Sequence, residues 1–124
     1  MTEPLIEYDE PSDTLYIAFV PGKSATGIEL NEHILLRVDL QRRTPVGLTL
    51  LDFSLLAQST EMGPRSFPLS GLADLSDEMR EMALEILRSA PVGDYLSLSA
   101  YTPATNQAVP ITSLRSDKLM MRAA

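Results

Sequence analysis

The sequence contains no cysteine, and its only histidine is His33. Without thiols the chain cannot form disulfides, zinc–thiolate sites or a thiol nucleophile. The absence of cysteine is compatible with the cytoplasm, where disulfides are rare. Histidine is the side chain best suited to act as a general base near neutral pH, so His33 is the only ready candidate for that role. Cysteine chemistry is therefore excluded, and histidine chemistry is limited to one residue.

Clusters of basic residues and long apolar runs are also missing. The net charge of −7 disfavours binding to a phosphate backbone, which requires grouped lysines and arginines. No apolar stretch approaches the length of a membrane span, and residues 1–10 have acidic side chains but neither the basic nor the apolar part of a signal peptide. We expect a cytoplasmic protein of one domain, residues 1–124, with no nucleic-acid or membrane partner.

An apolar run at residues 15–20 is the centre of the predicted fold. Side chains of a strand point alternately to its two faces, and here both sets are apolar. The two sets are Leu15, Ile17 and Phe19 on one face, and Tyr16, Ala18 and Val20 on the other. This pattern is typical of a strand that is covered on both sides.

Five short strands, at residues 5–8, 15–20, 27–30, 34–38 and 46–51, predict an antiparallel β-meander that fills residues 5–55. Alternation assigns one apolar inner face, provided that the loops at 31–33 and 41–43 have three residues each. A two-residue loop would move Leu35 and Arg37 into the core. Loops of this kind end in a left-handed residue, here His33 and Arg43. The expected inner-face pairs are Tyr8–Leu15, Ile6–Ile17, Ile17–Leu30, Phe19–Ile28, Ile28–Leu36, Ile34–Leu50, Leu36–Leu48 and Val38–Val46.

The second half of the chain has a different composition. Residues 56–75 are predicted to be a loop, and Ser76 begins an amphipathic helix over residues 76–90. One or two strands should follow at 94–112, with Pro110 restricting the second to an edge or a bulge. A mobile tail is expected at 113–124. The predicted class is α+β, with the helix packed on one face of the sheet.

Four blocks of the first half resemble one family. Ile6-Glu-Tyr-Asp9, Asp13-Thr-Leu-Tyr-Ile17, Asn31-Glu-His33 and Val46-Gly-Leu-Thr-Leu-Leu-Asp52 occur in the order and spacing of the bacterial domain of unknown function 2283 family. The resemblance covers about residues 5–55 and implies a small antiparallel β domain with no assigned activity. His33 and Arg43 stand where relatives usually have glycine.

The outer face of the sheet supplies the main functional hypothesis. One helix can cover one face of a small sheet, which leaves an apolar set on the other face. This candidate interface consists of Tyr16, Ala18, Val20, Leu35 and Leu51. We therefore expect a non-catalytic interaction or scaffold protein, either a homodimer or bound to a co-encoded partner, with no cofactor. The competing cover for this face is the strand at 95–101 of the same chain.

Two other hypotheses use different residues. A small-ligand module would bind on the outer face through Tyr16 and Arg37. An enzyme would need His33 with Ser12 or Ser24 as nucleophile, or a cation held by the acidic turn Asp9, Glu10 and Asp13. That turn lacks the ligand spacing of an EF-hand, so no metal site is expected, and His33 is expected at a turn.

Overall fold

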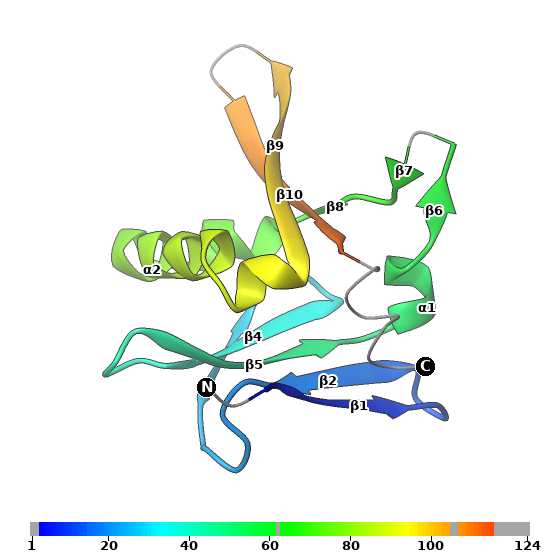
Figure 1. Ribbon diagram of the computed structural model, residues 1–124. Coiled ribbons are helices and arrows are strands. Elements are labelled where there is room, and N and C mark those ends of the chain that lie inside the picture. The colour runs from blue at the N-terminus through cyan, green and yellow to red at the C-terminus, as the bar shows by residue number, and fades with distance from the viewer. Residues whose placement is uncertain (1–2, 62, 105–106, 116–124) are drawn as a thin grey trace.

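A computed structural model describes residues 3–61, 63–104 and 107–115. A five-stranded antiparallel sheet forms one layer, and a long helix lies across one of its faces; on the same side, a C-terminal hairpin projects away from the sheet (Figure 1). The α+β class, the amphipathic helix and the C-terminal strands predicted from the sequence are confirmed. The sheet contains β1 (Leu5–Asp9), β2 (Thr14–Ala18), β3 (Thr26–Glu29), β4 (Ile34–Asp39) and β5 (Thr44–Leu50).

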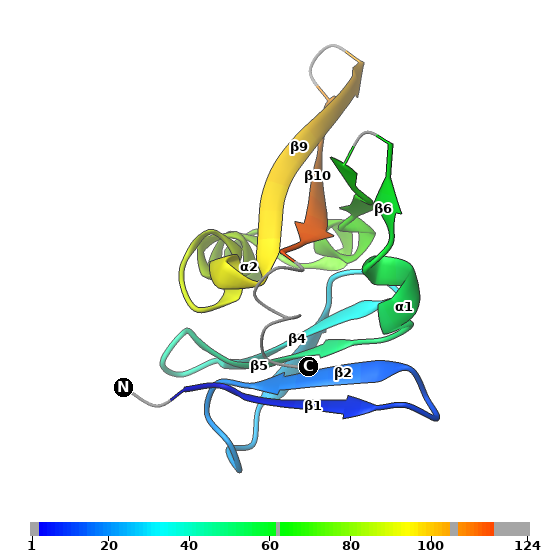
Figure 2. The same ribbon diagram turned by 45° about the vertical axis from the view of Figure 1, so that its right-hand side comes forward.

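The remaining elements follow the sheet in the chain and lie on its inner side (Figure 2). Residues 56–75, expected to be a loop, instead contain several short elements. In order, the elements are α1 (Phe53–Leu56), β6 (Ser59–Thr60), β7 (Gly63–Pro64), β8 (Phe67–Pro68), the 3-10 helix η1 (Ser70–Asp74), α2 (Asp77–Arg88), the 3-10 helix η2 (Val92–Asp94), β9 (Leu96–Ala104) and β10 (Gln107–Leu114).

The order of strands in the sheet is β1-β2-β5-β4-β3, so the predicted meander is wrong in one connection. Ile17 lies opposite Leu48 of β5, not opposite Leu30, and Phe19 does not pair with Ile28. The chain leaves β2 beside β5 and crosses the end of the sheet to reach β3 at the far edge, which gives a Greek-key order. Apolar alternation specifies the face to which each side chain points, but it does not specify which strand lies next to it. β5 has leucines at alternate positions, as the strand expected at 27–30 has apolar residues, so it can pair with β2 equally well.

Most of the other registers agree with the sequence analysis. On the inner face, the pairs Tyr8–Leu15, Ile6–Ile17, Ile28–Leu36, Leu36–Leu48 and Ile34–Leu50 all form. Their buried members include Ile28, Leu36 and Leu48, which are at most 2% exposed. A register shift after Arg37 places Val38 opposite Pro45 in place of Val46, and lengthens the following loop to residues 40–43.

The loop at 31–33 has the expected length but not the expected backbone. Among the described non-glycine residues, positive φ occurs at Asp13, Arg43 and Asp52, so the prediction holds for Arg43 and fails for His33. The Oδ1 atom of Asn31 accepts hydrogen bonds from the backbone N–H groups of His33 (2.8 Å) and Ile34 (2.9 Å). This side-chain turn closes the loop without a left-handed residue.

Helix α2 covers the inner face with one stripe. Ser76 accepts a hydrogen bond from the Met79 N–H group at the N-terminus of the helix, as the sequence predicts. Acidic residues occupy the first turn and Arg88 the last, which suits the helix dipole. The buried stripe consists of Met82, Ala83, Ile86 and Leu87.

The C-terminal hairpin completes the inner layer. Strand β10 pairs with β9 on one side and with β8 on the other, so it is not an edge strand. Its register with β9 shifts between Gln107 and Val109, next to Pro110, which agrees with the bulge that was the other predicted possibility. Just after β8, Gly71 of η1 donates a hydrogen bond to the Leu30 carbonyl oxygen that follows β3 (2.8 Å). Of the expected tail, residues 113–114 belong to β10 and residues 116–124 lie outside the described residues.

Candidate interaction surface

The register of the sheet places one residue from each strand in a row across the outer face. Each member of the middle row is paired directly with the next one. The two ends of this row are acidic, and the side chains between them are apolar or carry a hydroxyl group. In strand order, the row is Glu7, Tyr16, Thr49, Leu35 and Glu29. Its centre can therefore lose water without burying a charge.

The neighbouring row is built mostly from small residues. It runs Leu5, Ala18, Gly47, Arg37 and Gly27 across the five strands. A Cβ atom on Gly47 would lie 2.6 Å from the Ile17 carbonyl oxygen, and Arg37 Nη1 lies 3.6 Å from the same point. Glycine is therefore required at position 47, and the guanidinium of Arg37 lies above it. The Arg37 side chain therefore occupies the space over Gly47.

The structure exposes the predicted interface residues to different extents. Tyr16 is 46%, Val20 44% and Leu51 41% exposed, whereas Ala18 and Leu35 are half-buried. The sequence analysis did not include Leu5 in this set. Leu5 lies opposite Ala18 and is 49% exposed. The alternation of residues 5–8, which puts Glu7 on the outer face, also assigns Leu5 to it.

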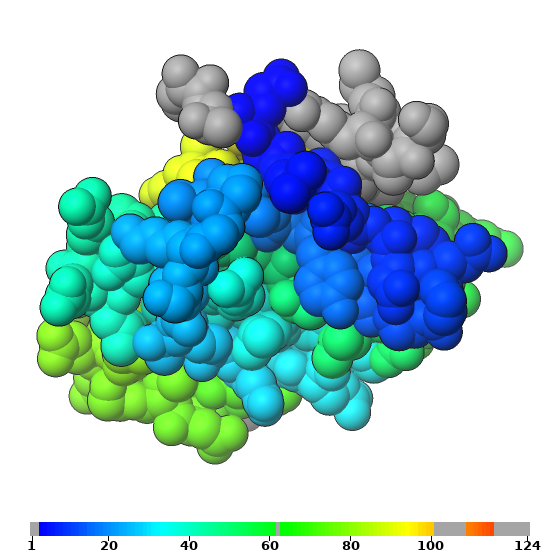
Figure 3. All heavy atoms as spheres, turned by 90° about the horizontal axis from the view of Figure 1, so that it is seen from below, coloured from blue at the N-terminus to red at the C-terminus, as the bar shows by residue number. Residues whose placement is uncertain are grey.

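Strand β9 does not cover this face. Leu96 at its start and Tyr95 just before it are buried in the core of the inner face, and the Tyr95 ring lies 6.1 Å from the ring of Phe19. Both ribbon views place the hairpin on the same side of the sheet as α2 (Figures 1 and 2). The competing prediction, that residues 95–101 cover the outer face, is wrong. Seen from below, atoms of the sheet form much of the surface (Figure 3).

The charged groups of the face are partly paired. Lys23 Nζ lies 2.7 Å from Asp39 Oδ2, and this hydrogen bond is the main reason that the pKa of Asp39 lies below its usual value. Arg37 Nη2 donates weakly to the Lys23 carbonyl oxygen at 3.4 Å. Arg37 has no carboxylate partner within 4.0 Å in the described part of the chain. Its positive charge is available to a bound group.

His33 is held by acidic and aromatic neighbours. Its Nδ1 atom lies 3.0 Å from Asp52 Oδ2, its Nε2 atom lies 3.7 Å from Glu32, and its ring meets the Phe67 ring at 6.1 Å. A histidine oriented by an aspartate is two-thirds of a hydrolytic triad. However, Ser12 bonds to Asp9 and Thr14, and Ser24 lies on the β2–β3 connection at the opposite end of the sheet. The structure does not bring either predicted nucleophile to His33.

The acidic turn after β1 has a structural arrangement. Asp13 accepts hydrogen bonds from Tyr8 Oη (2.6 Å) and from Ser54 Oγ (2.9 Å), and its backbone oxygen accepts from Phe53 N (2.9 Å). The hydrogen bond from Tyr8 is the first cause that lowers the pKa of Asp13 and raises that of Tyr8. Asp13 thus anchors the start of α1 to the first hairpin. Among the described residues, no group of three or more histidine or acidic side chains could hold a metal ion.

Within the described residues, no helix is both long enough and apolar enough to cross a membrane. Comparison with curated proteins and with solved structures finds no match in either set. The blocks that carry the resemblance now have structural roles: Tyr8 and Asp13 fix α1, Gly47 allows β2 and β5 to approach, and Asp52 holds His33. Residues 5–54, the five-stranded sheet and the beginning of α1, match the family described as protein of unknown function (DUF2283), and the C-terminal part of the chain lies outside this match.

Proposed function

We propose that this protein is a non-catalytic interaction protein of the cytoplasm that self-associates through the outer face of its sheet. The main supporting observation is the contrast between the two faces of β2. Ile17 is 2% exposed beneath the inner layer, while Tyr16, next to it in the chain, is 46% exposed. Exposed apolar patches of this kind commonly mark interfaces.

The residues of the outer face favour a second copy of the chain as the binding partner. Tyr16 lies in the row that ends in Glu7 and Glu29, and Arg37 lies in the neighbouring row between Gly47 and Gly27. A two-fold axis that passes between these positions places Tyr16 of each copy over Arg37 of the other. An aromatic ring over a guanidinium is attractive. A self-complementary patch is the requirement for a symmetric dimer.

The test is the solution mass of the intact chain by light scattering, for the parent protein and for Tyr16→Glu. We expect a dimer that Tyr16→Glu converts to a folded monomer, because the substitution places an uncompensated acid in the interface. Leu40→Glu is the matched control, since Leu40 is 44% exposed but lies in the loop between β4 and β5. This variant should remain a dimer.

Three results would count against the proposal. They are a parent protein that is monomeric at every concentration, a Tyr16→Glu variant that is still a dimer, and a Tyr16→Glu variant that fails to fold. The last result would mean that Tyr16 is needed for folding and that the outer face belongs to the core of the protein. Arg37→Ala tests the geometry separately, because it should weaken the dimer without changing the fold.

A small-ligand module on the same face is the second candidate. Arg37 favours it, because its guanidinium has no carboxylate partner within 4.0 Å in the described part of the chain. An anionic metabolite would bind the guanidinium and stack on Tyr16. A monomeric parent protein whose melting temperature rises with an aromatic carboxylate, and not after Arg37→Ala, would support this candidate over self-association.

A further inference from the structure

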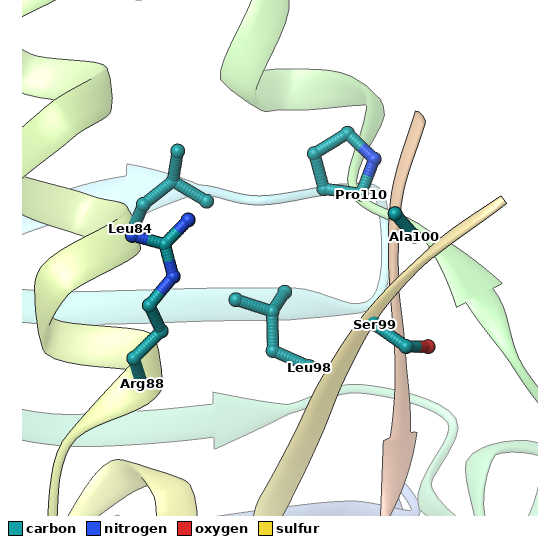
Figure 4. Close-up of a pocket in the computed structure, with 6 residues that line it drawn as sticks. All are labelled: Leu84, Arg88, Leu98, Ser99, Ala100 and Pro110. Atoms are coloured by element: carbon teal, nitrogen blue, oxygen red, sulfur yellow. The ribbon is translucent and has the colours of Figure 1, made fainter. Parts of the chain in front are cut away.

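A second hollow lies away from the outer face, between α2 and the C-terminal hairpin. Its volume is about 360 Å³, near the lower end of the range for small-molecule sites. Figure 4 shows Leu84 and Arg88 on the helix facing Leu98 of β9 across the space. The remaining lining residues are Ser99, Ala100 and Pro110.

The walls of this hollow are mainly apolar. Leu84, Leu98 and Pro110 are only partly buried, although the buried stripe of α2 lies close beside them. In Figure 4 the hydroxyl of Ser99 points away from the space. Leu98 and Ala100 therefore form the wall on the side of β9. Such walls suit an alkyl chain, because transfer of its apolar surface out of water is favourable in free energy.

The charged residue at this hollow is Arg88. Arg88 follows Leu84 by one helical turn, so the two side chains share a face of α2, and Figure 4 shows the guanidinium beside the Leu84 side chain. In the described part of the chain, Arg88 forms neither an ion pair within 4.0 Å nor a side-chain hydrogen bond. In contrast, Arg80, two turns earlier, bonds to Asp77 and to the carbonyl oxygens of Leu72 and Leu75.

We propose that this hollow binds an unbranched aliphatic carboxylate, such as a medium-chain fatty acid. The alkyl chain lies between Leu84 and Leu98, and the carboxylate is held by the guanidinium of Arg88. Arginine presents two parallel N–H groups to a carboxylate, which makes this pairing both strong and directional. The site is separate from the outer face and does not depend on self-association.

The probe is decanoate below its micelle concentration, titrated into the intact chain by calorimetry, with methyl decanoate as the uncharged counterpart. We expect decanoate to bind, and Arg88→Gln to weaken it about tenfold or more, the usual effect of losing a charged hydrogen bond. Arg42→Gln, which removes an equal charge from the exposed loop between β4 and β5, should bind decanoate as the parent protein does.

A second variant fills the space. Ala100 is exposed on β9, so Ala100→Phe should fold normally and abolish binding. Chemical shifts of the Leu84 and Leu98 methyl groups should move with decanoate, while those of Leu35 on the outer face should not. The proposal is overturned by an absence of binding, by equal binding of methyl decanoate, or by binding that survives both Arg88→Gln and Ala100→Phe.

Discussion

The two faces of the five-stranded sheet carry similar side chains but have different surroundings. On the inner face, Ile17, Leu36 and Leu48 are almost completely buried beneath α2, η1 and the start of the C-terminal hairpin. On the outer face, Tyr16 and Leu5 stay nearly half exposed because no described element covers them. The same strands therefore contribute to stability on one side and are available for binding on the other. Substitutions at adjacent positions should separate these two roles.

Leu36 and Leu35 form the most direct test, because they are neighbours in β4 on opposite faces. Leu36→Ala should destabilise the protein by about 2–5 kcal/mol, as expected for a fully buried leucine. Leu35→Ala should cost about 1 kcal/mol or less as a monomer, since Leu35 is half-buried. Denaturant unfolding measures both values. Equal losses would mean that the outer face is covered in solution.

Gly71 tests how the inner layer is joined to the sheet. A Cβ atom at this position would lie 1.9 Å from the Glu29 carbonyl oxygen, so Gly71→Ala must move backbone against backbone. We expect a loss of about 2 kcal/mol or more in unfolding free energy. Gly22→Ala provides a contrasting case, because its Cβ meets no atom and only its positive φ opposes the substitution. A similar loss in both variants would argue against the close contact between η1 and β3.

His33→Gly addresses the loop in which the sequence prediction failed. A left-handed residue would favour glycine, but His33 lacks positive φ and contacts both Asp52 and Phe67. The substitution should therefore destabilise the protein by about 1–2 kcal/mol, through lost contacts and a more flexible unfolded chain. Thermal and denaturant unfolding would check this value. A more stable His33→Gly variant would instead support the left-handed backbone that the sequence predicts at this position.

Asp13→Asn should give the smallest effect, and one that depends on pH. The pKa of Asp13 is lowered in the folded protein, so its stabilising contribution is present above its ordinary value of 3.8 and is lost as pH falls through the folded value. The difference in stability between the parent protein and the variant should therefore shrink in acid. Unfolding curves from pH 6 down to about pH 2.5 measure this. A difference that is constant over the range would contradict the assignment.

The arrangement of polar residues around Asp13 could be anticipated only in part. The turn residues at 9–13 were assigned to a hairpin from their composition, and the structure has that hairpin. The hydrogen bonds from Ser54 to Asp13 join residues 41 positions apart. Sequence pattern does not reveal such a pairing, because nothing periodic links a turn to a distant helix start. The contact of His33 with Asp52 was missed for the same reason.

The sequence by itself determined which residues of the first half face inwards, since alternation within a strand is a local property of the backbone. It also determined the start of α2 at Ser76 and the positive φ at Arg43. The tertiary structure alone decided that β5 lies beside β2. The strand expected at 27–30 and β5 both carry apolar residues at alternate positions, so either strand could pair with β2, and the path of the connecting segment at 19–25 decides between them. It also decided that the start of β9 joins α2 in the core on the inner side, where burial of apolar side chains is favourable, so that none of the described helices or strands covers the outer face.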